Sequence, residues 1–501
     1  DSLAELTRRC KRFNVPVVAG GPYPTSFHEN IPDIDYFVLN EAEVTLPKFL
    51  HDWEQGRAGR VYADTRKPDI SLSPAPRFEL LNMKSYGSMA LQYSRGCPFN
   101  CEFCDIIEMF GRTPRTKTIP QIQGELDHLY DLGWRGSVFF VDDNFIGNKK
   151  QVKGLLSVIA GWQKERDYPF EFFTEASIDL AADDELLDLM ASAGFNMVFV
   201  GIETPVEETL INAGKRQNVK HNMIESVKRI QHKGIEVTGG FIVGFDSDPP
   251  DIFERQIQFI QEAGIPLAMV GLLNALPNTQ LYRRLEREGR LLHDSSGNNT
   301  HDLHCNFEPK MNHDTLISGY KDIISDIYSY KSYFERCLTL LHNLKPHQNS
   351  SRRVRCEELV IFLRSLLRQT FTPYGLSYMR FLMKALLIER RMFPEAVRMA
   401  IWGHHFFKIT QEILAVDNFK IHARSVKDLY GEKIRTTCVS FDMDKTIREL
   451  KAAKDRFLKE LRREYQSIDK DFRHMVEDSL RNVEIALNTY YSQWLQCTAH
   501  C

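Results

Sequence analysis

The chain has 501 residues, of which 43% are hydrophobic and 26% are charged, and its formal net charge is −3. This balance is typical of a globular protein of about three domains. A charge so near zero predicts no nucleic-acid partner, and no apolar run reaches the length of a membrane span. The ten cysteines lack the dense spacing of a secreted disulfide scaffold, which favours a cytoplasmic protein.

Helix and strand patterns alternate in residues 1–65. Apolar runs at 15–19 and 35–39 predict two short buried strands. The pair Gly20-Gly21 follows the first strand, where glycine lets a ligand approach the backbone closely. This alternation is typical of the end of a doubly wound α/β domain. Since the chain opens directly in a helix pattern, we expect the earlier part of that domain to be missing.

A proline-punctuated stretch, residues 66–90, is predicted to be a linker without regular elements, and it leads to a group of three cysteines. Cys97, Cys101 and Cys104 stand in the order C-x3-C-x2-C, which suits one short loop around an iron–sulfur cube. Three thiolates leave one of the four irons open to a small molecule. A zinc knuckle, a disulfide loop and buried thiols are the alternatives. Zinc needs a fourth ligand, and the nearest histidine is His128.

The loop after the cysteines carries three cations, Arg112, Arg115 and Lys117. Arginine and lysine side chains of this density bind phosphate or carboxylate groups. We expect either such an anion site or a solvated loop.

Strand patterns alternate with helix patterns through residues 91–295. The strands are expected at 89–93, 137–141, 170–175, 197–203, 237–243 and 268–273. The helices between them are expected at 122–132, 150–162, 183–193, 219–233 and 252–263. Repeated strand–helix units with apolar strands predict a parallel barrel or sheet.

Acidic residues fall at the C-terminal ends of three of these strands. Asp143 follows one strand, Glu175 ends the next, and Glu203 ends the one after it. Because the chemistry of parallel barrels lies at that end, these carboxylates are candidates for binding a cofactor. The alternative is that each forms an ion pair at the mouth of the barrel.

The cysteine loop resembles the signature of the radical S-adenosylmethionine (SAM) superfamily, C-x3-C-x-aromatic-C, with Phe103 as the aromatic residue. The resemblance implies an open barrel of six strand–helix units and a 4Fe–4S cluster held by the three thiolates. It also implies that SAM chelates the open iron through its amino and carboxylate groups. One electron then cleaves SAM to a 5′-deoxyadenosyl radical. Phe103 is expected to add backbone contacts to the adenine.

Two later segments resemble the SAM-binding segments of the same superfamily. Gly201 and Glu203 belong to a G-I-E-T sequence that resembles G-I-E-S, which meets the amino acid and ribose of SAM. Gly240, Ile242 and Gly244 match a G-x-I-x-G segment whose backbone borders the adenine. The resemblance therefore implies that these five residues line the SAM site.

The N-terminal segment resembles the last third of the cobalamin-binding domain found upstream of many radical SAM enzymes. Gly20 and Gly21 match the glycine pair near the nucleotide tail of cobalamin. The G-E-x-E turn of that domain is Asn40-Glu41-Ala42-Glu43 here, a mild departure. A generic α/β fragment is the alternative. The motif that supplies a cobalt ligand would precede the first residue.

Residues 296–501 are predicted to form a mostly α-helical domain. From Ser351 to Gln411 there are 11 Lys or Arg against 4 Glu, on helices rich in Leu, Phe and Met. Such helices lie on an anionic membrane or contact a lipid, and we expect this segment to border the substrate entrance. The alternative is packing on the barrel, with arginine stems covering apolar surface.

The order of domains, together with the sequence GHHFFKITQEILAVDNF at 403–419, resembles a group of bacterial B12-binding radical SAM proteins that includes the hopanoid C-2 methylase. The resemblance implies cobalamin-dependent methylation of an unactivated carbon of a small or lipid-like substrate. It also implies an electron donor such as flavodoxin or ferredoxin, and contact with the inner face of the membrane is expected from the basic segment.

Two alternatives to methylation remain at this point. The first is a cobalamin-associated radical SAM enzyme that cyclises or rearranges its substrate without methyl transfer. The second is a noncatalytic iron–sulfur redox or sensor protein. A sensor needs no SAM pocket, so Glu203 and the segment from Gly240 to Gly244 speak against the second.

Overall fold

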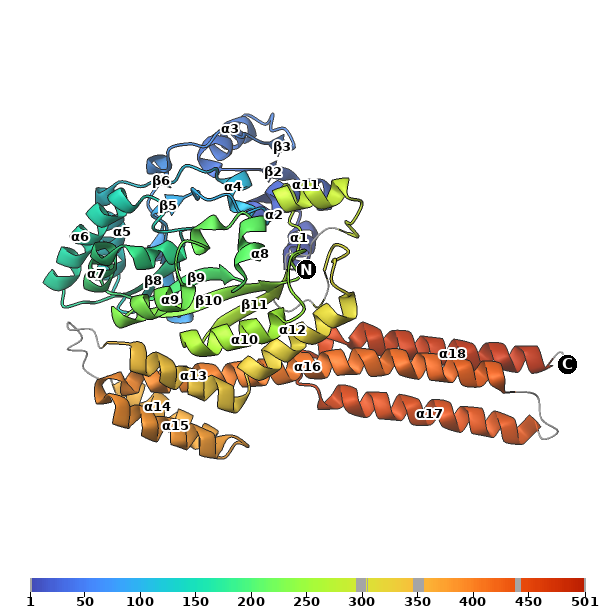
Figure 1. Ribbon diagram of the computed structural model, residues 1–501. Helices are drawn as coiled ribbons and strands as arrows, with labels where there is room; N and C mark the ends of the chain where they lie inside the picture. Colours follow the sequence, from blue (N-terminus) through green and yellow to red (C-terminus); the bar gives the residue numbers. More distant parts are fainter. Residues whose placement is uncertain (1, 294–302, 304, 346–355, 438–442, 500–501) are drawn as a thin grey trace. The chain divides into compact units, whose positions relative to one another are not determined.

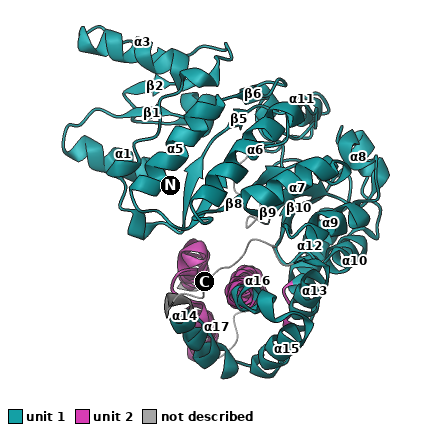
Figure 2. Cartoon of the chain, turned by 90° about the vertical axis from the view of Figure 1, so that its left-hand side faces the viewer, with its two compact units in different colours: residues 1–327, 331–399 teal, residues 328–330, 400–501 magenta. Residues whose placement is uncertain are grey.

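The computed structural model describes residues 2–293, 303, 305–345, 356–437 and 443–499. Side-chain burial is described for all of these except 2, 356–358, 443 and 497–499. The chain divides into two compact units: residues 1–327 with 331–399, and residues 328–330 with 400–501 (Figure 2). The predicted boundary at 295/296 lies outside the described residues, and the predicted domain limits stay predictions.

The first unit opens with a three-stranded parallel sheet in the order β1-β2-β3. Its elements are α1 (Ser2–Arg12), β1 (Val18–Gly20), α2 (Pro22–Phe27), β2 (Tyr36–Val38), α3 (Ala42–Glu54) and β3 (Val61–Tyr62). A small apolar core of Ala19, Ile31, Ile34, Phe37 and Leu39 supports it. Both predicted strands are present but shorter. The first begins only at Val18, which is 45% exposed, so this strand is buried on one face only.

The predicted linker is more ordered than expected. Three single turns of 3-10 helix occupy it, Ile70–Leu72, Phe78–Leu80 and Met83–Ser85, and β4 begins at Ser88. Ile70 and Phe78 are buried. Prolines at 68, 74 and 76 disfavour a long α-helix, but isolated apolar residues are enough to pack single turns against neighbouring elements.

A six-stranded parallel sheet follows, in the order β11-β10-β9-β8-β7-β4. Its strands β8 to β11 are labelled in Figure 1. Its strands are β4 (Ser88–Leu91), β7 (Ser137–Phe140), β8 (Glu171–Ala176), β9 (Phe195–Glu203), β10 (Glu236–Val243) and β11 (Ala268–Leu272). The main connecting helices are α5 (Ile119–Asp131), α6 (Lys149–Glu165), α7 (Asp184–Ala193), α9 (Met223–His232) and α10 (Ile252–Ala263). Between β9 and α9 lie α8 (Glu207–Asn212) and a 3-10 turn, Arg216–Asn218. The predicted α/β class, with six strand–helix units, is confirmed.

The two faces of this sheet differ. In β8, Phe172, Thr174 and Ala176 are buried, whereas Phe173 and Glu175 on the other face are half-exposed. Phe173 stacks on Phe139 of β7 with 4.6 Å between ring centroids. Because side chains alternate along a strand, one face packs against the helices and the other lines the hollow of the open barrel.

Helices α12 (His313–Ile327), α13 (Tyr330–Asn343), α14 (Cys356–Thr370) and α15 (Gly375–Ile388) follow in the first unit. Arg336 of α13 donates to the carbonyl of Pro266, just before β11. Arg398, in the first turns of α16 (Phe393–Thr436), pairs with Glu236 at 2.6 Å. Glu236 opens β10, so this helical region packs at the N-terminal ends of the strands.

The expectation that the basic helices border the substrate entrance is therefore wrong. Barrel chemistry lies at the C-terminal ends of strands, and the cysteine loop leaves the sheet there after β4. In Figure 1, α13, α14 and α15 lie on the opposite side of the sheet from α4 and β5.

The second unit consists of α16 from residue 400, α17 (Met443–Ser467) and α18 (Glu477–Ala499). Its apolar core includes Val416, Phe419, Val426, Tyr430, Leu461 and Leu487. The predicted helical character of the C-terminal region is confirmed. Among the described residues, no helix is both long and apolar enough to cross a membrane.

Candidate functional site

The cysteine loop lies between β5 (Ser94–Arg95) and α4 (Ile106–Met109), beyond the C-terminal end of β4. Cys101 is buried, while Cys97 and Cys104 are half-buried, and all three are free thiols. Burial raises the pKa of each thiol, that of Cys104 to about 12. Three free thiols on one loop fit the donor set of a cluster, since soft sulfur ligands suit iron and its positive charge offsets the cost of buried thiolates. Among the described residues, no three His, Cys, Asp or Glu are grouped to hold a single metal ion.

Glycines allow other segments to approach this loop closely. Gly96 has φ +92°, and a Cβ there would lie 2.9 Å from the carbonyl oxygen of Gly111. Gly214 has φ +75°, and a Cβ there would lie 2.5 Å from the carbonyl oxygen of Asn100. Both backbones are in the region that favours glycine, so neither position accepts a larger residue without moving the cysteines.

Polar side chains contact two of the sulfurs. Asn144 Nδ2 lies 3.8 Å from the sulfur of Cys97, and Gln217 Nε2 lies 3.7 Å from that of Cys101. Lys215 is buried nearby, and its charge acts to lower the pKa of Cys101 against the larger effect of burial. Amide donors and a cation favour negative charge on thiolates, and such contacts tune iron–sulfur clusters.

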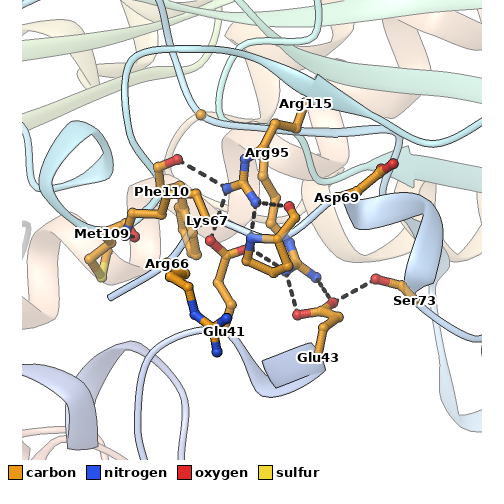
Figure 3. A network of polar contacts seen from close by, with 12 residues as sticks. Glu41, Glu43, Arg66, Lys67, Asp69, Ser73, Arg95, Met109, Phe110 and Arg115 are labelled. Atoms are coloured by element: carbon orange, nitrogen blue, oxygen red, sulfur yellow. Dashed lines mark hydrogen bonds and ion pairs between the residues drawn. The ribbon is translucent and has the colours of Figure 1, made fainter. Parts of the chain in front are cut away.

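Two arginines hold the loop against the N-terminal segment (Figure 3). Arg95 and Arg115 face each other across the antiparallel pair β5·β6, where β6 is Arg115–Thr116. Arg115 binds both carboxylate oxygens of Glu41 at 2.9 Å. Arg95 reaches Glu41 at 2.9 Å and binds Glu43 at 2.9 and 3.0 Å. Two like charges directly opposite each other repel, so the two carboxylates are what allow this pairing.

This network also shows what the cations after the cysteines do. Arg115 donates to the carbonyl groups of Pro68 and Phe110, and buried Lys117 pairs with Glu125 at 2.6 Å. The carboxylate ligands expected for these cations therefore come from the chain itself, and neither cation is in a solvated loop. Only Arg112 of the three is exposed.

Helix α11 (Gln280–Arg287) holds the other side of the loop. Leu281 N donates to the carbonyl of Glu102, the residue after Cys101, at 2.8 Å. Arg284 pairs with the Glu102 carboxylate at 3.0 Å and with Asp246 at 2.8 Å. Arg290 also binds Asp246, and although burial acts to raise the pKa of Asp246, hydrogen bonds from both arginines bring it to about 2.

The acidic residues at the strand ends have different surroundings. Asp142 is buried and accepts hydrogen bonds from the backbone N–H groups of Tyr93 and Ser94, both at 2.7 Å. Asp143 accepts from Gly96 N at 3.0 Å, so it braces the cysteine loop. Glu175 has no hydrogen-bond or ion-pair partner for its carboxylate among the described residues. Burial, with a smaller effect of nearby Asp143, raises the pKa of Glu175 to about 7.

Glu203 forms an ion pair with Lys215, which is the alternative that the sequence left open for it. Glu203 has φ +64°, an unusual backbone for a non-glycine residue. Its side chain folds back over Gly201, where a Cβ would lie 2.5 Å from Glu203 Oε1 and 2.7 Å from Lys215 Nζ. Gly201 is therefore required by this pair, whose role toward a cofactor stays a prediction.

The predicted adenine-side residues lie on β10 and just after it. A Cβ on Gly240 would lie 2.9 Å from the Phe199 ring, so this glycine makes room for an aromatic residue of β9. The carbonyl of Ile242 accepts from Gln256 at 2.8 Å. Gly244 has φ +103° and donates to Asp248 at 2.8 Å. Phe103 contacts Phe245, with 5.8 Å between ring centroids, which places the cysteine loop beside the end of β10.

A cavity of about 280 Å³ lies between the N-terminal segment and the cysteine loop. Its lining includes Gly21, Thr25, Asn40, Gln92, Arg95 and Phe110. The two predicted glycines differ here. A Cβ on Gly20 would lie 2.6 Å from the carbonyl oxygen of Val38, so Gly20 serves the packing of β1 on β2, whereas Gly21 has open space beside it.

The structure brings Cys97, Cys101, Cys104, Phe103 and Glu203 into one region, and it adds Lys215 and Gln217, which the sequence did not single out. These two follow the strand that ends at Glu203 in the short segment around 3-10 turn Arg216–Asn218. Their burial, which distinguishes them from ordinary polar loop residues, is visible only in the structure. No spacing rule connects residues 215–217 with cysteines more than a hundred positions earlier.

Two family models match the chain. The model of the Radical SAM superfamily matches residues 91–267, and that of a Domain of unknown function (DUF4070) matches residues 279–418. The second begins with helix α11, so the region it describes contributes directly to holding the cysteine loop.

Two relatives cover much of the chain. An uncharacterised methyltransferase of Synechocystis is 44% identical over 338 residues, 67% of this chain and 63% of the relative. The hopanoid C-2 methylase of Rhodopseudomonas palustris is 34% identical over 422 residues, 81% of this chain and 78% of that protein. The chain thus spans less than two thirds of the Synechocystis relative.

A solved structure has a similar fold. It is that of the radical SAM methyltransferase TsrM from Kitasatospora setae, with cobalamin and a 4Fe–4S cluster bound. The TM-score is 0.52 at 16% sequence identity, and the match covers 80% of this chain and 83% of that one. At this identity the likeness concerns the fold.

Proposed function

Because this chain belongs to the radical SAM superfamily, in the group that contains the hopanoid C-2 methylase, we propose that it is an enzyme that cleaves SAM and methylates an unactivated carbon. The observation that carries the proposal is the cysteine loop: three free thiols held in place by the N-terminal segment on one side and α11 on the other. A redox or sensor protein also needs a cluster, but it does not need the glycines and carboxylates that the superfamily resemblance assigns to SAM.

The three thiolates would hold a 4Fe–4S cluster, which supplies the electron that cleaves SAM when both are bound. Asn144 and Gln217 would then donate to cluster-bound sulfurs, and Lys215 would favour the net negative charge of the thiolates. Asn144, Gln217 and Lys215 thus give the buried side of the loop polar surroundings.

Five residues, Phe103, Gly201, Gly240, Ile242 and Gly244, would border SAM with backbone atoms, as the superfamily resemblance implies. Among the acids, Glu175 is best suited to a direct contact, because its carboxylate has no partner among the described residues and lies at the C-terminal end of β8. It would accept hydrogen bonds from amino or hydroxyl groups of SAM. Asp143 would act through Gly96, and Glu203 through Lys215.

Cobalamin is proposed as the second cofactor, and it would supply the methyl group. The cavity beside Gly21 is open to both the N-terminal segment and the cysteine loop, and the absent side chain of Gly21 leaves room for a ligand. The Glu41–Arg95 and Glu41–Arg115 pairs would hold the two walls of this cavity together. Gly20 is assigned to packing and no longer to a ligand contact.

For the substrate we propose a lipid-like molecule. The hollow of the barrel carries the half-exposed Phe139–Phe173 stack two residues before Glu175, which suits an apolar molecule better than a charged one. An electron donor such as flavodoxin or ferredoxin is proposed as partner, and so is a peripheral contact with the membrane.

The test is reductive incubation of the iron-reconstituted protein with methyl-labelled SAM and bacterial lipid extracts. We expect 5′-deoxyadenosine and a labelled lipid. Cys101→Ala should abolish both along with the iron–sulfur absorbance, whereas Cys305→Ala, at a buried thiol elsewhere, should retain them.

The alternatives give different results in the same experiment. Formation of 5′-deoxyadenosine without label transfer would favour a cyclisation or rearrangement. Absence of SAM cleavage by a protein with its cluster intact would favour a redox or sensor protein. Full SAM cleavage by the Cys101→Ala protein would refute the cluster assignment.

A further inference from the structure

Helices α14 and α15 form a hairpin with a polar and aromatic seam. The hydroxyl groups of Ser365 and Tyr378 lie 3.1 Å apart, and Gln369 Nε2 donates to Ser365 Oγ at 2.9 Å. On its inner side the hairpin packs on α13, where Phe381 stacks on Phe334 with 4.9 Å between ring centroids. The hairpin is thus attached to the barrel through α13, and the face opposite this contact is exposed to solvent.

That outer face exposes large apolar side chains. Leu376 is 87% exposed, and Phe371 and Leu387 are each 84% exposed. Leu363, Leu367 and Met383 are also more than half exposed. Single exposed apolar residues are ordinary, but a group on two adjacent helices marks an interaction surface.

Cations are interleaved with these apolar residues at helical spacing. Arg364 and Arg368 follow Leu363 and Leu367 directly on α14, and Arg380 and Lys384 occupy the same face of α15 as Leu376, Met383 and Leu387. Both pairs, together with Arg390 and Arg391, are exposed. None of the six is in an ion pair among the described residues, and residues 359–391 contain one acid, Glu389, which caps Arg391 N.

We propose that the outer face of the α14–α15 hairpin, residues 359–391, docks on the surface of an anionic lipid bilayer. The apolar side chains would enter the boundary between headgroups and acyl chains while the cations bind phosphate groups. A second copy of this face is a poor partner, because six cations would meet six cations with one acid on each side. The purpose of this docking, access to lipid-like substrates, rests on the proposed function. The binding of the hairpin to vesicles can be tested without it.

The hairpin acts as an anchor and not as an entrance. The hairpin packs on α13, and Arg336 of α13 donates to the carbonyl of Pro266 just before β11. This places the hairpin at the N-terminal ends of the barrel strands, whereas the cysteine loop lies at their C-terminal ends. Membrane binding would hold the enzyme near its substrate without covering the cluster. Loss of binding is therefore expected to leave SAM cleavage in solution unchanged.

The test is co-sedimentation of the protein with vesicles of phosphatidylcholine alone or with added phosphatidylglycerol, at low and at high salt. The parent protein should prefer the anionic vesicles, and high salt should weaken the binding. A variant with Arg364→Gln, Arg368→Gln, Arg380→Gln and Lys384→Gln should bind at least about a hundredfold more weakly, since each basic residue near the surface raises binding about fivefold.

A matched control removes four exposed cations from α17, with Lys451→Gln, Arg456→Gln, Lys459→Gln and Arg463→Gln, and should bind like the parent. An apolar variant, with Leu367→Ser, Phe371→Ser, Leu376→Ser and Leu387→Ser, should also lose binding. Circular dichroism and SAM cleavage establish that each variant is folded.

Three outcomes would overturn the proposal. The first is equal binding of the parent to neutral and anionic vesicles, or none to either. The second is an equal loss of binding in the α17 control, which would indicate a general charge effect. The third is a stable dimer of the parent that the apolar variant converts to a monomer, which would make this face a protein interface. None of these outcomes bears on SAM cleavage, so the proposed function is judged separately.

Discussion

The cysteine loop and the α14–α15 hairpin use the same residue type in opposite ways. Arg95 and Arg115 beside the loop are 17% and 15% exposed in their side chains, and each binds carboxylates. Arg364 and Arg368 on the hairpin are exposed and lie outside every ion pair of the described residues. A guanidinium removed from water needs a fixed partner, whereas an exposed one is available to a partner from outside.

The difference indicates which arginines are held by partners within the chain and which are available to bind a partner from outside. At the C-terminal ends of the strands, charges from the N-terminal segment and α11 converge on one short loop. At the opposite end, the hairpin contributes packing on one side and an open face on the other.

The largest difference is expected between Glu41→Ala and Arg364→Ala. Glu41 is almost fully buried, and its removal leaves Arg115 without its bidentate partner, so the free energy of unfolding of the first unit should fall by about 3 kcal/mol. Arg364→Ala should change it by less than about 0.5 kcal/mol. Calorimetric unfolding of both variants measures the difference. Equal effects would mean that the loop network contributes no more to stability than an exposed side chain.

The pH dependence of Glu43 should give a smaller effect. Burial acts to raise the pKa of its carboxyl, but hydrogen bonds from Arg95 and Ser73 outweigh it and lower the pKa to about 2 from its ordinary value of 4.5. The ionised form is thus stabilised by folding. This contribution is fully present above pH 4.5 and is lost as the pH falls toward 2.

Because solvent screens the pair in part, we expect a loss of about 2 kcal/mol over that range. Glu43→Gln should flatten this part of the pH profile of the unfolding temperature relative to the parent. An unchanged slope in the variant would show that other carboxyl groups cause the acid sensitivity. Glu389→Gln on the hairpin is the matched control.

The smallest effect is expected at Glu175, whose carboxylate is half-buried without a partner among the described residues. Its pKa of about 7 means that folding favours the protonated form, so stability decreases as the pH rises from 4.5 through 7. Glu175→Gln should therefore stabilise the cofactor-free protein by about 1 kcal/mol at pH 8, after allowance for screening, and by nothing near pH 4.

The same variant should bind SAM more weakly, as measured by calorimetric titration of the reconstituted protein. A gain in stability together with a loss of binding would mark a residue kept for its function. A loss of stability at pH 8 would mean that Glu175 has a structural partner when ionised.

The sequence predicted the barrel well because its strands and helices are long and regular. Helix α10 was predicted with the observed bounds, Ile252–Ala263, since an apolar pattern of period 3.6 ends there at Gly264. The N-terminal strands were predicted too long because short apolar runs do not reveal which residues find a partner strand. The order within 66–90 was missed because single turns depend on packing.

Charged residues were the least predictable part. The sequence could place Arg115, Lys117 and Glu203 near the cysteines, but it could not show that Glu41, Glu125 and Lys215 bind them, because such partners are fixed only when distant elements meet. The same holds for Arg284 of α11, whose partner Glu102 lies 182 positions away. An ion pair has no sequence period, unlike an amphipathic helix.

Consecutive residues were enough to indicate the chemistry of this protein: three cysteines at a spacing that suits one iron–sulfur cube, and six strand–helix units that carry their loop. Local spacing and hydrophobic periodicity are written in consecutive residues, so they can be read without coordinates. The folded chain was needed to show that the basic helices lie at the far end of the barrel from the cluster loop, and that Gly20 serves packing while Gly21 faces a cavity. Those facts depend on which surfaces bury each other, and free energy of burial is a property of the whole fold.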